Sequence, residues 1–93
     1  MSEPTHIEIR GYDGKIIETV PILRTVTLRG IPGFCIHQYK GEYRVSHIET
    51  GGYLARGTTD GEAFVAARRY DKEEIESRIE GCRVKIARLL ERE

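Results

Sequence analysis

The sequence lacks net charge and any long apolar run, and each absence excludes a class of protein. Its 93 residues carry 15 Lys or Arg and 15 Asp or Glu, so bulk attraction to phosphate backbones is absent and a histone-like role is excluded. No apolar stretch approaches the roughly 18 residues that a membrane-spanning helix needs. The first residues show no basic segment followed by an apolar one, so we expect no signal peptide and a cytoplasmic protein.

Cysteine is also scarce. Cys35 and Cys82 share no C-x-x-C spacing, which argues against a zinc site and a disulfide framework and favours a reducing compartment. The three histidines do not stand at a recognised metal-ligand spacing, and no glycine run matches a phosphate-binding loop. We therefore expect neither a metal nor a cofactor.

What is present is an ordinary globular composition, with 39% hydrophobic and 32% charged residues. The length predicts a single domain over residues 1–93, with a flexible tail at 1–5 and a β-sheet region at 6–57. Asp13-Gly14 predicts a hairpin turn after a first strand. Pro21 predicts a bend, a strand start or an edge, and Gly30-Ile31-Pro32-Gly33 predicts another turn.

The next hairpin allows its register to be worked out. If Lys40 and Gly41 are the two central turn residues, Tyr39 lies opposite Glu42 and His37 opposite Arg44. Cys35 then lies opposite Ser46, and this set shares the outward face. The more apolar set predicts the core face: Phe34, Ile36, Gln38, Tyr43, Val45 and His47.

Two helices complete the predicted chain. Thr59 with Glu62 is a capping-box pattern that opens a short buried helix at 59–70, and Asp71 with Glu74 opens an amphipathic helix at 72–90. The second helix carries an apolar stripe that predicts docking on the sheet or a dimer contact, the dimer residues being Ile86, Leu89 and Leu90. The fold class is α+β: an antiparallel sheet of about five or six short strands followed by two C-terminal helices.

A catalytic interpretation would use Cys35 with His37, because a thiol beside an imidazole can form an activated nucleophile. The register places His47 on the opposite face, and no third group that would orient the imidazole is evident. We therefore expect no catalytic residues and a protein that is not an enzyme.

The outward sheet face and the first hairpin tip offer a mixture of Tyr, Arg and His that is typical of protein interfaces. This predicts a small non-enzymatic protein-binding module, with the partner-binding residues Tyr12, His37, Tyr39, Arg44, Ser46, Arg24 and Arg56. An alternative stays open: five basic residues against two acidic ones in 22–57, with tyrosines among them, would suit stacking of single-stranded nucleic acid on the sheet.

The stretch Tyr43-Arg44-Val45-Ser46-His47-Ile48-Glu49-Thr50-Gly51, followed by Gly57-Thr58-Thr59 and Glu62-Ala63, resembles a pattern of small phage and prophage accessory proteins. That resemblance implies an accessory protein of a mobile element, of the kind represented by anti-CRISPR proteins, which inhibits or regulates a host complex. The helix-start part also resembles the sheet-to-helix step of HicB-like antitoxins, from which this chain differs by having no helix between its early strands.

Overall fold

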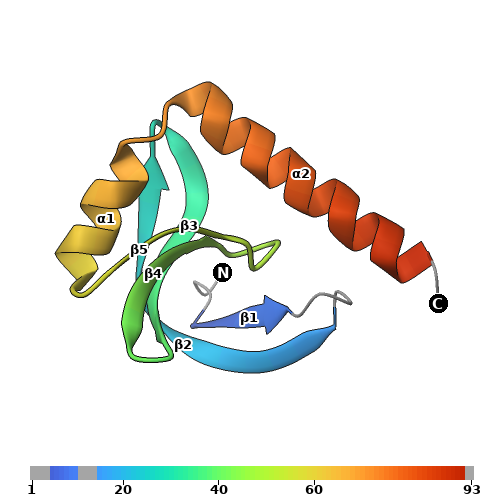
Figure 1. The fold of residues 1–93 in the computed structure, drawn as a ribbon, viewed down its shortest axis with the longest axis horizontal. Coiled ribbons are helices and arrows are strands. Elements are labelled where there is room, and N and C mark those ends of the chain that lie inside the picture. Colours follow the sequence, from blue (N-terminus) through green and yellow to red (C-terminus); the bar gives the residue numbers. More distant parts are fainter. Residues whose placement is uncertain (1–4, 11–14, 92–93) are drawn as a thin grey trace.

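The chain folds into an antiparallel sheet followed by two helices, as Figure 1 shows, and this confirms the expected α+β class. The computed structural model describes residues 5–10 and 15–91. The five strands are β1 (His6–Arg10), β2 (Ile16–Leu28), β3 (Ile31–Tyr39), β4 (Glu42–His47) and β5 (Tyr53–Gly57), and they lie in the sheet in sequence order. The helices are α1 (Asp60–Arg68) and α2 (Lys72–Glu91).

The register predicted for the β3–β4 hairpin is confirmed. Tyr39 pairs with Glu42, His37 with Arg44 and Cys35 with Ser46. The turn works because Lys40 and Gly41 both adopt positive φ, at 50° and 81°, which is the backbone geometry of a two-residue turn that follows the twist of the strands.

Of the alternatives predicted for Pro21, the strand start is wrong, because residues 16–28 form one strand, and this strand is bent (Figure 1). The first half of β2 pairs with β1, with Val20 opposite Ile7, and its second half pairs with β3, with Val26 opposite Phe34. Pro21 lies at the end of the β1–β2 ladder, where its missing N–H leaves no partner unsatisfied, and the next amide, that of Ile22, donates to the carbonyl of Thr5. Thr5, expected in the flexible tail, is thus bonded to β2.

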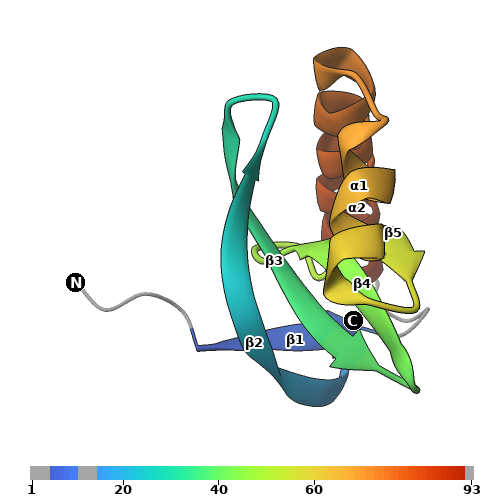
Figure 2. The same cartoon turned by 90° about the vertical axis from the view of Figure 1, so that its left-hand side faces the viewer.

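The long, bent β2 carries β1 to the face of the sheet opposite α1, as Figures 1 and 2 show. The strand β3 is therefore buried on both sides. Its Phe34 and Ile36 belong to the core under the helices: Leu28, Phe34, Ile36, Val45, Leu54, Ala55, Ala63, Ala67 and Ile75. Its Cys35 belongs to a smaller core under β1: Ile7, Ile9, Val20 and Cys35.

The turn between β2 and β3 comes earlier than the sequence predicts. Arg29 and Gly30 form it, with φ of 52° and 79°, and Ile31 already pairs with Leu28. The Arg29 side chain donates to the carbonyls of Arg68, at 2.7 Å, and Tyr70, at 3.1 Å. These carbonyls lie at the end of α1, where the helix leaves acceptors without intrahelical partners, so the hairpin tip caps the helix.

Thr59 starts α1 as predicted, because its hydroxyl accepts the Glu62 amide at 3.1 Å. The Glu62 carboxylate in turn accepts from the amide of Thr58, one residue before the position that a standard capping box uses. The expectation that α1 is buried all round is wrong: Ala63 and Ala67 face the sheet, whereas Val65 is 54% exposed. One packed face is enough to hold a helix of nine residues.

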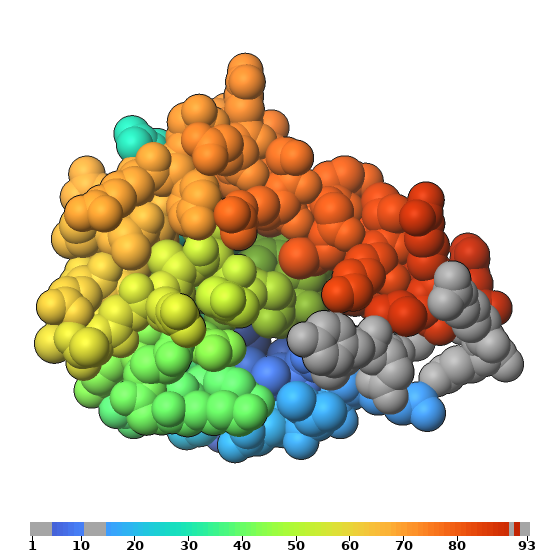
Figure 3. All heavy atoms as spheres, in the orientation of Figure 1, coloured from blue at the N-terminus to red at the C-terminus, as the bar shows by residue number. Residues whose placement is uncertain are grey.

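The second helix begins where the sequence predicts, with Asp71 accepting the Glu74 amide at 2.8 Å. Its stripe follows the sheet only in part. Ile75 is fully buried, while Ile79, Cys82, Ile86 and Leu89 are half-buried. Figure 1 shows the later turns of α2 extending away from α1 and β5, and Figure 3 shows the earlier turns resting on the β4–β5 region. Among the described residues, no helix is both long and apolar enough to cross a membrane.

Candidate functional site

A hollow of about 430 Å³ opens on the face where β1, the β3–β4 hairpin and α2 meet. We name it the basic hollow, because four cationic side chains line it and none of its described lining residues is acidic. The same face is visibly hollowed in Figure 3. The lining comprises Ile9, Arg10, Ile17, His37, Tyr39, Lys40, Arg44, Ser46, Gly51, Gly52, Tyr53 and Lys85.

Arg44 is the most constrained of the cations. Its guanidinium lies 4.9 Å from the ring centre of Tyr39 and 4.5 Å from that of Tyr53, both within the range of a cation–π contact. Nε donates to Glu42 Oε2 at 3.0 Å, and the other oxygen of Glu42 lies 3.8 Å from Arg56. Two rings and one carboxylate therefore fix the plane of this guanidinium.

His37 and Ser46 form the floor of the basic hollow. Nδ1 of His37 donates to the carbonyl of Gln38 at 3.3 Å, so Nε2 accepts the hydroxyl proton of Ser46, at 2.7 Å. Burial lowers the pKa of His37, the Gln38 bond opposes that shift, and nearby Arg44 lowers the pKa further. The imidazole is therefore neutral at physiological pH. Both side chains are 0% exposed, which leaves the serine hydroxyl closed to an incoming substrate.

The Cys35 thiol lies behind this floor, in the core under β1. Burial raises its pKa to about 12, with a backbone hydrogen bond from Ser46 opposing the shift only in part. A thiol with such a pKa is almost wholly protonated at neutral pH and is a poor nucleophile. Cys35 therefore acts as a small core residue in this fold.

The structure divides the residues predicted to bind a partner. Tyr39, Arg44 and Arg56 lie together on one face, linked through Glu42. The expected exposure of His37 and Ser46 is wrong, because β1 and β2 cover the face on which they lie. Their polar atoms pair with each other instead of reaching solvent.

The remaining predicted residues lie elsewhere. Arg24 sits over the ring of Phe64 in α1, at 5.4 Å, and so is remote from Arg44. Tyr12 lies outside the described residues, as does the side chain of Leu90. Ile86 and Leu89, expected at a dimer contact, continue the half-buried stripe of Ile79 and Cys82, and a contact with a second copy stays a prediction.

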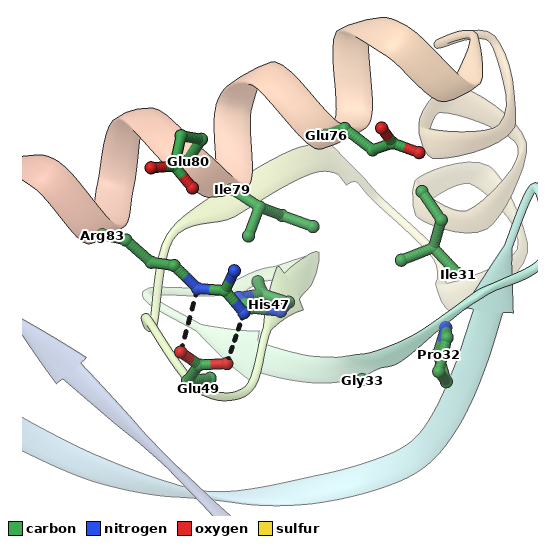
Figure 4. Close-up of a pocket in the computed structure, with 9 residues that line it drawn as sticks. All are labelled: Ile31, Pro32, Gly33, His47, Glu49, Glu76, Ile79, Glu80 and Arg83. Atoms are coloured by element: carbon green, nitrogen blue, oxygen red, sulfur yellow. Dashed lines mark hydrogen bonds and ion pairs between the residues drawn. The ribbon is translucent and has the colours of Figure 1, made fainter.

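A second hollow, of about 680 Å³, lies between α2 and the ends of β3 and β4 (Figure 4). Arg83 spans one side, donating from Nε and Nη2 to the two oxygens of Glu49 at 3.0 and 2.8 Å. His47 faces it from the sheet, and its Nδ1 shares a 3.0 Å hydrogen bond with Thr50. Burial lowers the pKa of His47, Glu49 opposes that shift and Arg83 adds to it.

Glu76 and Glu80 of α2 complete the acidic side of this second hollow. The described residues nevertheless contain no group of three or more His, Cys, Asp or Glu placed to hold a metal ion. The hollow is thus an open groove braced by an ion pair, with no assembled set of ligands.

Sequence reasoning missed part of the basic hollow. Arg10 and Lys85 stand 75 positions apart in the numbering and line the same hollow only because β2 folds β1 back toward α2. No periodicity within one segment could show this. The predicted partner-binding residues omit Glu42, although Arg44 two residues later on the same strand face is a signal of an ion pair.

Comparison with protein-family models, with curated proteins and with solved structures found no match. The function is therefore inferred from the residues that line the two hollows.

Proposed function

We propose that the protein is a small non-enzymatic binding module that docks on a macromolecular partner through the mouth of the basic hollow. The observation that carries this proposal is the stack of Tyr39, Arg44 and Tyr53. Tyrosine and arginine are the side chains most often found at energetic centres of protein interfaces. Here they are held in place before binding, so little conformational freedom is lost when a partner arrives.

The surroundings of the stack support docking over turnover. Tyr53 is 51% exposed at the rim, and the neighbouring exposed Ile17 adds apolar area. The two groups that chemistry would need are withheld, since Cys35 is protonated and the hydroxyl of Ser46 is closed to solvent. Steric occupation of a partner's surface requires neither of them.

The partner class is proposed from the resemblance of residues 43–63 to phage accessory proteins. On that basis the module belongs to a phage or mobile element, acts in the host cytoplasm, and inhibits or regulates a host complex. Both cysteines are free thiols, which suits a reducing compartment. Single-stranded nucleic acid is the competing partner, and the experiment below separates the two.

The test is affinity capture from a lysate of a defence-system-bearing bacterial host, with immobilised wild-type protein and two variants. Tyr53→Ala removes one ring of the stack. Val65→Ala removes a side chain of similar exposure, 54%, on the outer face of α1. We expect a host protein to be retained by the wild type and by Val65→Ala, and its affinity to fall about 30-fold with Tyr53→Ala.

Two results would contradict the proposal. One is equal retention of every captured protein by Tyr53→Ala and the wild type. The other is retention of oligonucleotides alone at physiological salt, which would make the nucleic-acid alternative the better description.

A further inference from the structure

We infer that the basic hollow receives a carboxylate, supplied by an acidic side chain of the protein partner, and that Arg44 is the residue that binds it. This inference rests on the proposed function and names the chemistry that the partner must present. The argument begins with the unused end of the Arg44 guanidinium.

Only Nε of Arg44 is engaged by Glu42. Nη1 and Nη2 have no acceptor among the described residues, yet no buried polar side-chain atom there lacks a partner. The Nη atoms therefore keep contact with solvent, and Arg44 is one of the residues that line the hollow. Two parallel N–H groups in a fixed plane are the geometry that binds a carboxylate through two hydrogen bonds.

The stack makes Arg44 a better receptor than an ordinary surface arginine. The rings of Tyr39 and Tyr53 flank the guanidinium and exclude water from it, and the Arg44 side chain is only 18% exposed. An ion pair gains strength as the local dielectric falls. The positions of the rings also fix the direction of approach, because a carboxylate must enter edge-on between Tyr39 and Tyr53.

The lining suits an anion of modest size. The ammonium group of Lys40 lies over the ring of Tyr39, 5.3 Å from its centre, and adds positive potential at the mouth of the hollow. About 430 Å³ is ample for an acidic side chain and its first methylene groups. No described lining residue is acidic, so none of the described lining residues repels the anion.

A polyanionic chain fits less well than a single carboxylate. The protein carries no net charge, so a nucleic acid gains nothing from it at long range. The first half of α2 is acidic, and Glu73, Glu74, Glu76 and Glu80 would repel a phosphate chain that extended over the molecule. The ring of Tyr39, which a base would need for stacking, is already in contact with Lys40 and Arg44.

The experiment is a titration of the ¹⁵N-labelled full chain with a capped hexapeptide of alternating glutamate and glycine, followed through the Arg44 Nε–H resonance. The matched peptide carries glutamine in place of glutamate. We expect saturable shifts at Arg44 with the glutamate peptide, and binding at least tenfold weaker with the glutamine peptide. Inorganic phosphate and a dodecamer of thymidine are titrated in parallel at 150 mM salt.

Two variants sharpen the result. Arg44→Lys keeps the charge and the contact with the rings but loses the two-pronged donor, and we expect it to weaken the glutamate peptide about tenfold. Arg78→Lys is the control, because Arg78 also lies over a tyrosine ring, 4.5 Å from the centre of Tyr70, but does not line the hollow. It should bind like the wild type.

The inference is overturned if the Arg44 resonance does not move, if both peptides bind alike, or if Arg44→Lys binds as the wild type does. Tighter binding of the thymidine dodecamer than of the glutamate peptide would also overturn it. Capture of a host protein that depends on Tyr53 but not on Arg44 would reject this inference and leave the proposed function standing. Capture that depends on neither residue would reject both.

Discussion

The imidazole of His37 on β3 accepts a 2.7 Å hydrogen bond from the hydroxyl of Ser46 on β4, and neither side chain touches solvent. The pair looks like the start of a hydrolase dyad. Its enclosure gives it another role, since two polar groups on adjacent strands satisfy each other under β1. A neutral imidazole is a condition of that arrangement, and this makes the fold sensitive to acid.

Stability should fall as the pH is lowered from 7.5 to 5. Burial lowers the pKa of His37 in the folded chain, whereas the unfolded chain takes up the proton near the ordinary value of about 6.5. Below that pH the unfolded state binds more protons, so the free energy of unfolding decreases. Urea denaturation across this range measures the slope.

In His37→Gln the free energy of unfolding should depend less steeply on pH. Part of the dependence should remain, because the pKa of His47 is lowered too. The variant of the exposed His6, His6→Gln, is the control for the loss of a histidine as such. A wild-type stability that stays constant between pH 7.5 and 5 would contradict this prediction.

Thiol labelling should distinguish the two cysteines. Cys35 is 0% exposed with a pKa of about 12, while Cys82 is half-buried on α2. We expect one thiol per chain to react with an aromatic disulfide reagent at pH 8, and the second only in denaturant. In the Cys82→Ser variant, labelling of the native protein should vanish, and rapid labelling of that variant would show that Cys35 is accessible.

Gly51→Ala should destabilise the protein more than Gly41→Ala. Both glycines have positive φ, at 72° and 81°, so both variants bear a backbone cost of about 1–2 kcal/mol. At Gly51 an added Cβ would also lie 2.5 Å from the carbonyl oxygen of Glu8 in β1, whereas at Gly41 nothing lies within 4 Å. We expect Gly51→Ala to lower the free energy of unfolding by a total on the order of 3 kcal/mol or more. Thermal unfolding of the two variants would reveal equal losses if the close approach to β1 were unimportant.

The anchoring of α2 should be concentrated at its first turns. Ile75 is 0% exposed in the main core, so Ile75→Ala should cost about 2–5 kcal/mol of folding free energy. Ile86 is half-buried, and Ile86→Ala should cost about 1 kcal/mol. Denaturant midpoints of both variants give the comparison, and a larger loss at Ile86 would place the anchor in the second half of the helix.

A homodimer through the end of α2 would be broken by a charge there. If the contact forms, Leu89→Glu should shift sedimentation from dimer to monomer, and circular dichroism should show the fold retained. Val84→Glu, at a 40% exposed position outside the apolar stripe, is the matched control and should stay dimeric. A wild-type protein that sediments as a monomer at high concentration would remove the dimer.

Local signals in the sequence predicted local structure well. The Lys40-Gly41 turn fixed the pairing of β3 with β4, and Thr59 and Asp71 marked both helix starts, because each of these features depends on residues within four positions. The same reasoning failed at Pro21, where one of the predicted alternatives is a strand start, whereas the residue lies at the end of one ladder within a continuous strand.

That single error explains why the site was only partly predicted. A strand start at Pro21 would give β1 no reason to cover β3, and on that expectation Cys35, His37 and Ser46 lie on an open face. The stack around Arg44 was within reach, since Tyr39 and Arg44 share that face by alternation. The presence of Arg10 and Lys85 in the lining of the basic hollow could not be predicted, because it depends on the path of β2 through space.

The order of the strands in the sheet also bears on how the chain reaches its fold. Each strand lies beside the strands that precede and follow it along the chain, so every ladder closes through a short connection and no segment has to thread past another. The entropy lost in closing short loops is small, and domains of such local topology fold fast, on the order of milliseconds. A chain that emerges from the ribosome therefore forms its sheet hairpin by hairpin, and α2 packs over the sheet after β5 has joined it.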